Sequence, residues 1–191
     1  ASLIPYSDIY KTAEAFPSMI ASTLDSAVVG SVKPVTYDAL TNTYYTYKVI
    51  GKTIQADSVL FRQLGVVGKD AADIAIKADS IITALNSGAQ FGEIAKKYNQ
   101  ASDSAWIVSD QFQNASLDID NSLFISTLYG MKAGETKKLK FDSGATVILQ
   151  VLETANPVTK YNIAAVVKEL KFSDETYNRE NKKNTAVGEV S

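Results

Sequence analysis

Hydrophobic residues along this chain recur with two different periods, which divide the sequence into expected helices and strands. The clearest helical period follows Gly68, where apolar side chains lie on one face at steps of four, three and four residues: Ile74, Ala78, Ile81 and Leu85. Asp70 is a suitable N-cap, and Gly88 follows the last apolar position. A shorter helical face comes next, formed by Phe91, Ile94, Ala95 and Tyr98. The pattern predicts two consecutive amphipathic helices.

Strand-like stretches rich in aromatic and β-branched residues precede these helices. We interpret residues 30–52 as two strands around a turn at residues 38–42, and residues 54–66 as a further strand. Residues 1–26 have a loose helical spacing, which Pro17 is expected to interrupt.

The second half of the chain adds one helix and several strands. Residues 99–120 are polar and irregular, and are expected to form a long loop. The elements predicted after this loop are a helix at 121–129, a strand at 136–141, a tight turn at 142–144, a strand at 145–153, a strand at 160–172 and a polar helix from 173 onward. Pro157 is expected to separate the last two strands. An antiparallel sheet covered by helices would bury these apolar faces, so the predicted fold class is α+β.

A weak internal repeat suggests how the chain is divided. Residues 27–52 and 129–153 each run from apolar residues through Gly, a strand and an Asp-containing turn to a second strand. The predicted units are the end of a preceding helix-plus-strands unit at 1–53, a central domain at 54–156, and a strand and helix that open a following unit at 157–191. The strand near residues 161–170 is expected to join the first unit.

Composition removes several classes of function. The 191 residues include 19 basic and 21 acidic ones, mixed along the chain, so no basic surface for nucleic acid is expected. No stretch approaches the roughly 18 apolar residues that a membrane span needs. The chain has no Cys and no His, which excludes disulfides, thiolate nucleophiles and imidazole chemistry. Nucleotide-binding motifs are missing, and the acidic groups Asp70, Asp73 and Asp79 share one helix, so neither a cofactor nor a metal site is predicted.

Three stretches of the sequence together resemble a known family. They are ADSVLFRQLGV at 56–66, ADSIITALNSGAQFGEIAKKYNQASDSA at 78–105, and LYGMKAGETKKLKFDSGATVILQVLE at 128–153. This region resembles the parvulin-type (PpiC) peptidyl-prolyl cis-trans isomerases, in the setting of multidomain periplasmic foldases of the SurA and PpiD type. The resemblance implies a parvulin-like (FKBP-like) antiparallel sheet covered by helices, with flanking partial α+β segments. It also implies a periplasmic protein, with a membrane anchor outside this sequence as one option.

The sequence departs from the family where the resemblance places catalysis. Gln63 and Thr146 stand where the family carries two His residues, and Ala101 stands where it carries Asp or Cys. SAWIVSDQF, at 104–112, replaces a Gly-Gly-Asp-Leu-Gly run. Phe124 matches a position of the substrate pocket. The resemblance therefore supports the scaffold and leaves catalysis in doubt.

The polar pair Arg62 and Gln63 lies in the middle of a strand-like segment and allows two interpretations. In the first, Gln63 forms a hydrogen bond with Thr146 across neighbouring strands, as the remnant of a catalytic network. In the second, the pair lies near a sheet edge, where Arg62 reaches solvent and Gln63 caps a loop. Both interpretations satisfy the polar groups, whose burial without partners costs roughly 1–3 kcal/mol.

Three aromatic residues are candidates for contact with a polypeptide substrate: Phe124, Trp106 and Phe112. For Phe124 we favour packing in the core over ligand contact. For Trp106 we favour a role as a loop anchor.

Three functions remain open. The first is a chaperone-like domain that binds unfolded or proline-containing polypeptides through shallow apolar grooves and sheet edges, with little or no isomerase activity. The second is an active prolyl isomerase that relies on desolvation around Phe124. The third is an architectural or self-association module. No nucleic-acid partner is expected, and no membrane span within this chain.

Overall fold

Two long antiparallel strands form the backbone of the molecule in the computed structural model, which describes residues 2–4, 6–171 and 178–179. β2 (Thr43–Val66) and β5 (Thr146–Glu169) have 24 residues each and pair along their whole length. The shorter strands are β1 (Val32–Asp38), β3 (Ala105–Val108) and β4 (Thr136–Lys140). The sheet order is β1-β2-β5-β4, and β3 pairs with β2. Every pairing is antiparallel.

The helices complete an α+β fold. They are α1 (Ser18–Leu24), α2 (Ala71–Asn86), α3 (Phe91–Lys97) and α4 (Ile119–Tyr129), with short 3-10 helices η1 (Ala13–Ala15) and η2 (Ser109–Gln111). The predicted α+β class, with helices covering an antiparallel sheet, is confirmed. Most of the polar helix predicted from residue 173 lies outside the described residues.

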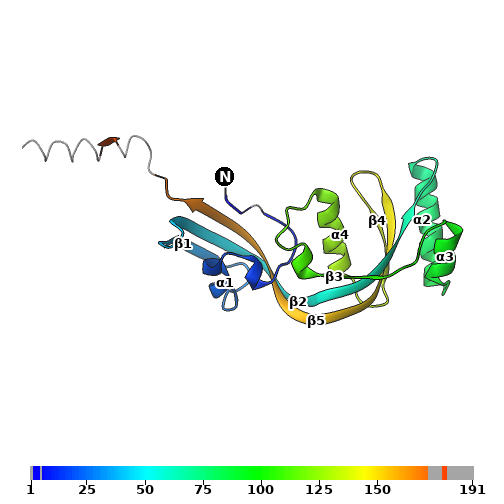
Figure 1. Cartoon of the computed structure of the whole chain (residues 1–191), viewed down its shortest axis with the longest axis horizontal. Helices are drawn as coiled ribbons and strands as arrows, with labels where there is room; N and C mark the ends of the chain where they lie inside the picture. The colour runs from blue at the N-terminus through cyan, green and yellow to red at the C-terminus, as the bar shows by residue number, and fades with distance from the viewer. Residues whose placement is uncertain (1, 5, 172–177, 180–191) are drawn as a thin grey trace, which may run out of the picture.

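The molecule has two lobes, which share the β2–β5 ribbon (Figure 1). The small lobe contains β1, η1, α1 and the adjoining ends of β2 and β5; the large lobe contains α2, α3, α4, β3, β4 and the opposite ends of the two long strands. The buried core of the small lobe consists of Ile20, Leu24, Tyr45, Tyr47, Val49, Tyr161, Ile163 and Val167. Residues 43–52 pair with 161–169 in this lobe, as the internal repeat suggested.

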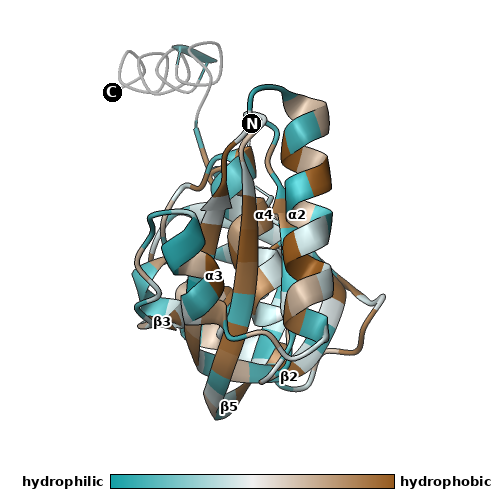
Figure 2. Ribbon diagram, turned by 90° about the vertical axis from the view of Figure 1, so that its right-hand side faces the viewer, coloured by the Kyte–Doolittle hydropathy of each residue, from teal (hydrophilic) through white to brown (hydrophobic). Residues whose placement is uncertain are grey.

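The large lobe has a core on each face of the sheet. On one face, α2 and α3 pack against Leu64, Val66 and Ile148. On the other face, Leu128 of α4 and Leu139 of β4 pack with Leu149 and neighbouring apolar residues. Figure 2 shows the end of this lobe, with polar and apolar residues alternating around α2. Both faces of the sheet are therefore covered here, whereas α1 covers one face in the small lobe.

Two predicted breaks in the strands are absent. β2 continues through residues 50–54 with an irregularity between Val49 and Gly51, and β5 continues through Pro157, which lies opposite Ala56. At Pro157 the strand has a neighbour on one side only, since β4 pairs with residues 146–150 and the N-terminal segment meets β5 at Tyr161. A residue without an N–H is tolerated at such a free edge. β2 crosses the predicted boundary between residues 53 and 54, and β5 crosses the one between 156 and 157. The division into three units stays a prediction.

Two other expectations were wrong in part. The predicted loop at 99–120 contains β3 and η2, because four residues suffice for an edge strand beside β2. The N-terminal residues before η1 are not helical; the segment runs beside β5, where Leu3 N–H donates to the carbonyl of Val167 at 2.8 Å and Lys11 pairs with Tyr161. Pro17 immediately precedes α1, so the helix starts after the predicted interruption.

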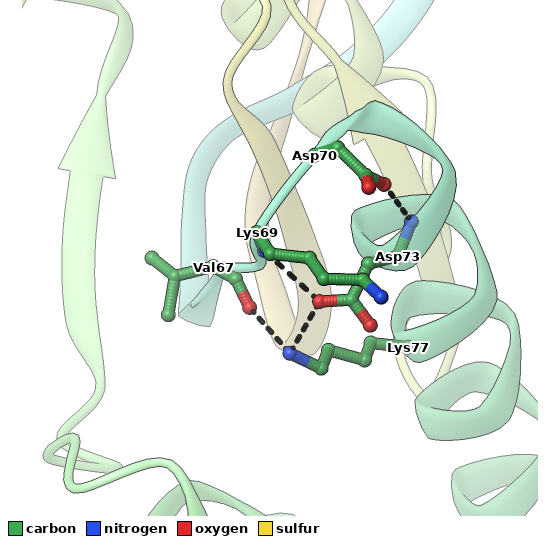
Figure 3. A network of polar contacts seen from close by, with 5 residues as sticks. All are labelled: Val67, Lys69, Asp70, Asp73 and Lys77. Atoms are coloured by element: carbon green, nitrogen blue, oxygen red, sulfur yellow. Dashed lines mark hydrogen bonds and ion pairs between the residues drawn. The ribbon is translucent and has the colours of Figure 1, made fainter.

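A compact polar network fixes the start of α2, as predicted from Asp70 (Figure 3). The Asp70 carboxylate accepts a hydrogen bond from the Asp73 N–H at 2.8 Å. The Asp73 carboxylate accepts from Lys77 Nζ at 2.8 Å and from the Lys69 N–H at 3.0 Å. These bonds, above all the one from Lys77, lower the pKa of Asp73. The bond from the Asp73 N–H satisfies a donor that the first helical turn leaves without an intrahelical partner, and the other two bonds tie Lys69 and Lys77 to Asp73. The network thereby fixes where the chain leaves β2.

Candidate functional site

The two positions aligned with the family's His residues lie on opposite faces of the sheet. Gln63 is paired with Leu149, and Thr146 is paired with Val66. Directly opposed residues share a face, and positions three apart along a strand point to opposite faces. Gln63 is thus on the α4 side and Thr146 on the α2 side. The expected Gln63–Thr146 hydrogen bond is wrong, because the intervening sheet separates the two side chains.

Gln63 lies beside a pair of aromatic rings. Phe61 is two residues earlier on the same face of β2, and its ring meets that of Phe124 from α4 edge-on, with centroids 5.6 Å apart. Both rings are half-buried, while Gln63 is exposed. Phe124 packs against buried residues of α4 and β5, which supports the favoured core role, and part of its ring remains accessible. We call this shallow feature the Phe61–Phe124 surface.

Arg62 belongs to the other face, where it is part of a packed network. Its guanidinium carbon lies 4.5 Å from the centroid of the Phe91 ring, and its Nε donates to Gln150 Oε1 at 2.9 Å. Gln150 in turn donates to Thr136 Oγ1 at 3.2 Å. Burial lowers the pKa of Arg62. The interpretation in which Arg62 merely reaches solvent is therefore incomplete: the side chain is half-buried, and its cation–π contact joins α3 to the sheet.

The edge of β2 near Gln63 is completed by a side chain. β3 pairs with β2 only as far as Phe61. Beyond it, the amide of Gln100 accepts from the Gly65 N–H at 2.8 Å and donates to the Gly65 carbonyl at 2.6 Å. Ala101, the third aligned family position, follows directly and is exposed. Gln63 therefore does lie near a sheet edge, as the second interpretation proposed, although Gln100 makes the capping bonds.

Thr146 lies apart from both positions. It is buried and lines a cavity of about 410 Å³ between the start of α2 and the β4–β5 hairpin, together with Lys138, Lys140 and Ile74. Gln63 and Ala101 thus lie near the same edge of β2, while Thr146 lies on the other face of the sheet, so the three aligned positions do not form one constellation.

The other two aromatic candidates, Trp106 and Phe112, lie in different surroundings. Trp106 is 45% exposed and lies on β3 opposite Leu60. Its neighbour Ile107 packs with Phe124, so the alternation along the strand turns Trp106 away from that ring. Phe112 is buried, with its centroid 5.1 Å from that of Tyr129. Of the predicted trio, Phe124 and Phe112 belong to one apolar cluster, while Trp106 faces elsewhere.

A buried lysine that the sequence did not single out lies where the two lobes meet. Lys160 is fully buried; its Nζ donates to the Ala56 carbonyl at 2.8 Å and to Ser109 Oγ, and lies 4.3 Å from the centroid of the Tyr129 ring. Burial lowers the pKa of Lys160 to about 8, against the opposing effect of Asp57. Burial also raises the pKa of Tyr129 to about 12.

This cluster ties together elements from both ends of the ribbon. Ser109 donates to the Asp57 carbonyl at 3.3 Å, and Tyr129 Oη donates to the same carbonyl at 3.1 Å. Ser109 is as inaccessible as Lys160, so this Ser–Lys pair cannot meet a substrate. Its role is to join η2 and α4 to the ribbon. No sequence pattern marks it, since an isolated Lys in a strand is normally exposed.

Among the described residues, no three acidic side chains converge as metal ligands would. No helix in the described part of the chain is long and apolar enough to cross a membrane. A scan of the sequence against models of protein families finds no match, and a search among curated proteins likewise finds none.

Proposed function

We propose that the large lobe is a parvulin-like domain that binds extended polypeptide segments, with little or no prolyl isomerase activity, as part of a periplasmic folding factor. The main support for the absence of isomerase activity is that Gln63 and Thr146 lie on opposite faces of the sheet. Two groups separated in this way cannot form one network beneath a proline. A scaffold with the family's order of elements and without its catalytic geometry is suited to binding.

The order of elements supports the scaffold half of this proposal. Strand, two helices, helix, strand and strand follow one another in the order predicted from the sequence, on an antiparallel sheet. The additions are β3, which is paired with β2, and the short helix η2.

The Phe61–Phe124 surface is the best candidate for the binding site. It combines two half-exposed rings with the exposed amide of Gln63. Apolar rings supply contact area, and an amide can pair with the backbone of an extended peptide. Sheet edges suit the role less well than expected. The β4 edge carries Lys137, Lys138 and Lys140, and lysines on an edge oppose the addition of another strand.

The test is exchange NMR on an isotope-labelled Ala-Pro peptide, with and without the protein. We expect cis-trans exchange at the uncatalysed rate, together with shifts of the peptide resonances on binding. Phe124→Ala should abolish those shifts. Trp106→Ala is the matched control, because this ring points away from the surface and its loss should leave binding unchanged.

Accelerated exchange that Phe124→Ala abolishes would instead identify an active isomerase. Absence of both acceleration and peptide shifts would favour the architectural alternative. A holdase assay, which measures whether the protein suppresses the aggregation of an unfolded client, would distinguish polypeptide binding from the architectural role.

A further inference from the structure

One face of the small lobe is open. The inward-facing side chains of Tyr45, Tyr47 and Val49 are buried under α1. The alternate residues point to the other side, where Val32 is 63%, Tyr37 43%, Tyr44 41% and Val166 45% exposed. The register brings these four together: Tyr37 pairs with Tyr44, Val32 with Lys48, and Val166 with Thr46. We call this set the outer face.

The residues of the outer face form an ordered surface. The rings of Tyr37 and Tyr44 are 5.0 Å apart between centroids, and Tyr37 Oη donates to Asn42 Oδ1 at 2.8 Å. The hydrogen bond of Tyr37 and the contact between the two rings restrict both side chains, so their apolar ring faces can be presented at little cost in entropy. On this face the apolar side chains are interspersed with Thr46, Lys48 and Lys168. Exposed apolar residues gathered on one side and rimmed by polar ones are typical of an interaction site.

The outer face continues a layer that is covered elsewhere. Lys160 and Val166 lie on the same face of β5, six residues apart. The irregularity opposite this stretch adds Ile50 to β2 and leaves the alternation along β5 intact. Above Lys160 lie Ser109 of η2 and Tyr129 of α4. The helical layer ends there, while β2 and β5 run on towards Thr43 and Glu169 (Figure 1). A helix packed on the outer face would extend this layer, which is the usual way to cover a sheet.

The edges of the small lobe favour a partner that lies across the face over one that extends the sheet. The outer edge, β1, has an irregular register between Lys33 and Thr36, and Pro34 within it lacks an N–H. The β5 edge is occupied, because Leu3 and Lys11 make backbone hydrogen bonds to it.

Charge selects among possible partners. Lys48 and Lys168 point outward with Tyr44, and they are the charged side chains on this face within the part of the chain that the structure describes. Two copies stacked face to face would oppose lysine to lysine. A partner with acidic side chains beside its apolar ones would complement the surface in both respects.

We propose that the outer face is a docking surface for an amphipathic helix, supplied by another polypeptide segment, whose apolar stripe covers Tyr44 and Val166 and whose acidic residues pair with Lys48 and Lys168. This inference goes beyond the proposed function, because the surface lies in the other lobe from the Phe61–Phe124 surface.

The test uses the whole chain and two synthetic helical peptides that share one leucine stripe, flanked by Glu in one peptide and by Lys in the other. The Glu peptide should bind the native protein, and the Lys peptide should not. The double variant Lys48→Glu/Lys168→Glu should reverse this preference, with affinity for the Glu peptide falling about tenfold or more, or roughly 1.4 kcal/mol. Phe124→Ala should leave binding of the Glu peptide unchanged.

NMR resonances provide a second readout that does not depend on the double variant folding. Side-chain signals of Tyr37, Tyr44 and Val166 should shift when the Glu peptide is added. Equal binding of both peptides, or of neither, would overturn the proposal. Binding of the native protein to vesicles of anionic phosphatidylglycerol, without binding of the Glu peptide, would overturn it in favour of a membrane surface.

Discussion

The two ends of the β2–β5 ribbon differ in how their faces are covered. At the large-lobe end, helices pack on both faces, so adjacent residues such as Ile148 and Leu149 are both fully buried. At the small-lobe end, adjacent residues alternate: Tyr45 is buried, and Tyr44 and Thr46 point to the opposite, open face. One pair of strands thus serves as a central sheet at one end and as a one-sided sheet at the other.

This difference shows that burial is set by the elements brought to the ribbon and not by the strands themselves. The large lobe is a closed unit, whose one candidate site is a shallow surface. The small lobe leaves an ordered apolar face exposed, which a folded protein normally does only where it meets a partner.

The largest effect should come from removing a fully buried leucine in either lobe. Leu149→Ala in the large lobe and Leu24→Ala in the small lobe should each lower the free energy of unfolding by about 2–5 kcal/mol, because each leaves a cavity in a packed core. Since the lobes share β2 and β5, both variants should unfold in one transition. The fluorescence of Trp106, in the large lobe, and far-UV circular dichroism should then report the same midpoint.

Two separated transitions in Leu24→Ala, with Trp106 responding only to the later one, would show that the two lobes do not unfold together. The lobes would then be independent units joined by the ribbon.

The next effect concerns Lys160, where the lobes meet. Its pKa is about 8 in the folded protein, against an ordinary value of 10.5. Between these pH values the unfolded chain binds more protons at this lysine than the folded chain does, so its contribution to stability should rise with pH. The full rise corresponds to about 3 kcal/mol. Denaturant unfolding between pH 7 and pH 10 should show part of this rise in the native protein, and Lys160→Met should lack it.

The upper pH limit of this measurement matters. Burial raises the pKa of both Tyr129 and Tyr161 to about 12, and a raised tyrosine pKa makes stability fall as pH rises above its unfolded value of about 10. A native protein and a Lys160→Met variant with parallel profiles below pH 10 would contradict the assignment of a protonated, desolvated Lys160.

A smaller effect should come from the helix caps of the large lobe. Asp70 and Asp118 precede α2 and α4, and their carboxylates accept backbone N–H bonds, whereas α1 of the small lobe and α3 of the large lobe have no side-chain cap bond. Asp70→Ala and Asp118→Ala should each cost about 1 kcal/mol of stability in thermal unfolding. The matched variants Asp70→Asn and Asp118→Asn keep an acceptor and should cost less. Equal losses for Ala and Asn would point to charge instead of capping.

The smallest effects should distinguish the two members of the polar pair. Arg62→Ala removes the contact with Phe91 and the bond to Gln150, and should cost about 1 kcal/mol. Gln63→Ala, at an exposed position, should change stability by less than about 0.5 kcal/mol. If Arg62→Ala and Gln63→Ala lower the free energy of unfolding by similar amounts in chemical denaturation, Gln63 has a structural role.

Local patterns in the sequence were sufficient to predict the helices of the large lobe. The spacing of Ile74, Ala78 and Ile81, with Asp70 before them, predicted α2 because both the apolar period and the cap act within a few residues. β3 escaped prediction, because a four-residue edge strand is stabilised by its pairing with β2 rather than by its own pattern.

The candidate site was predicted less well than the fold. Phe124 was correctly placed in a packed cluster, while the bond between Gln63 and Thr146 required a register that no sequence pattern specifies. A shift of one residue in register reverses the face of every side chain, so an alignment can name both positions and still misjudge whether they meet.

The α+β class and the helices with a strong apolar period could be predicted from the sequence, since they follow from interactions between residues close together in the chain. Three features emerge only in the folded protein: β2 and β5 run unbroken through both lobes, Lys160 is buried where the lobes meet, and Tyr44 faces open solvent. The reason is that burial and register depend on contacts between residues more than a hundred positions apart, such as Thr43 and Glu169.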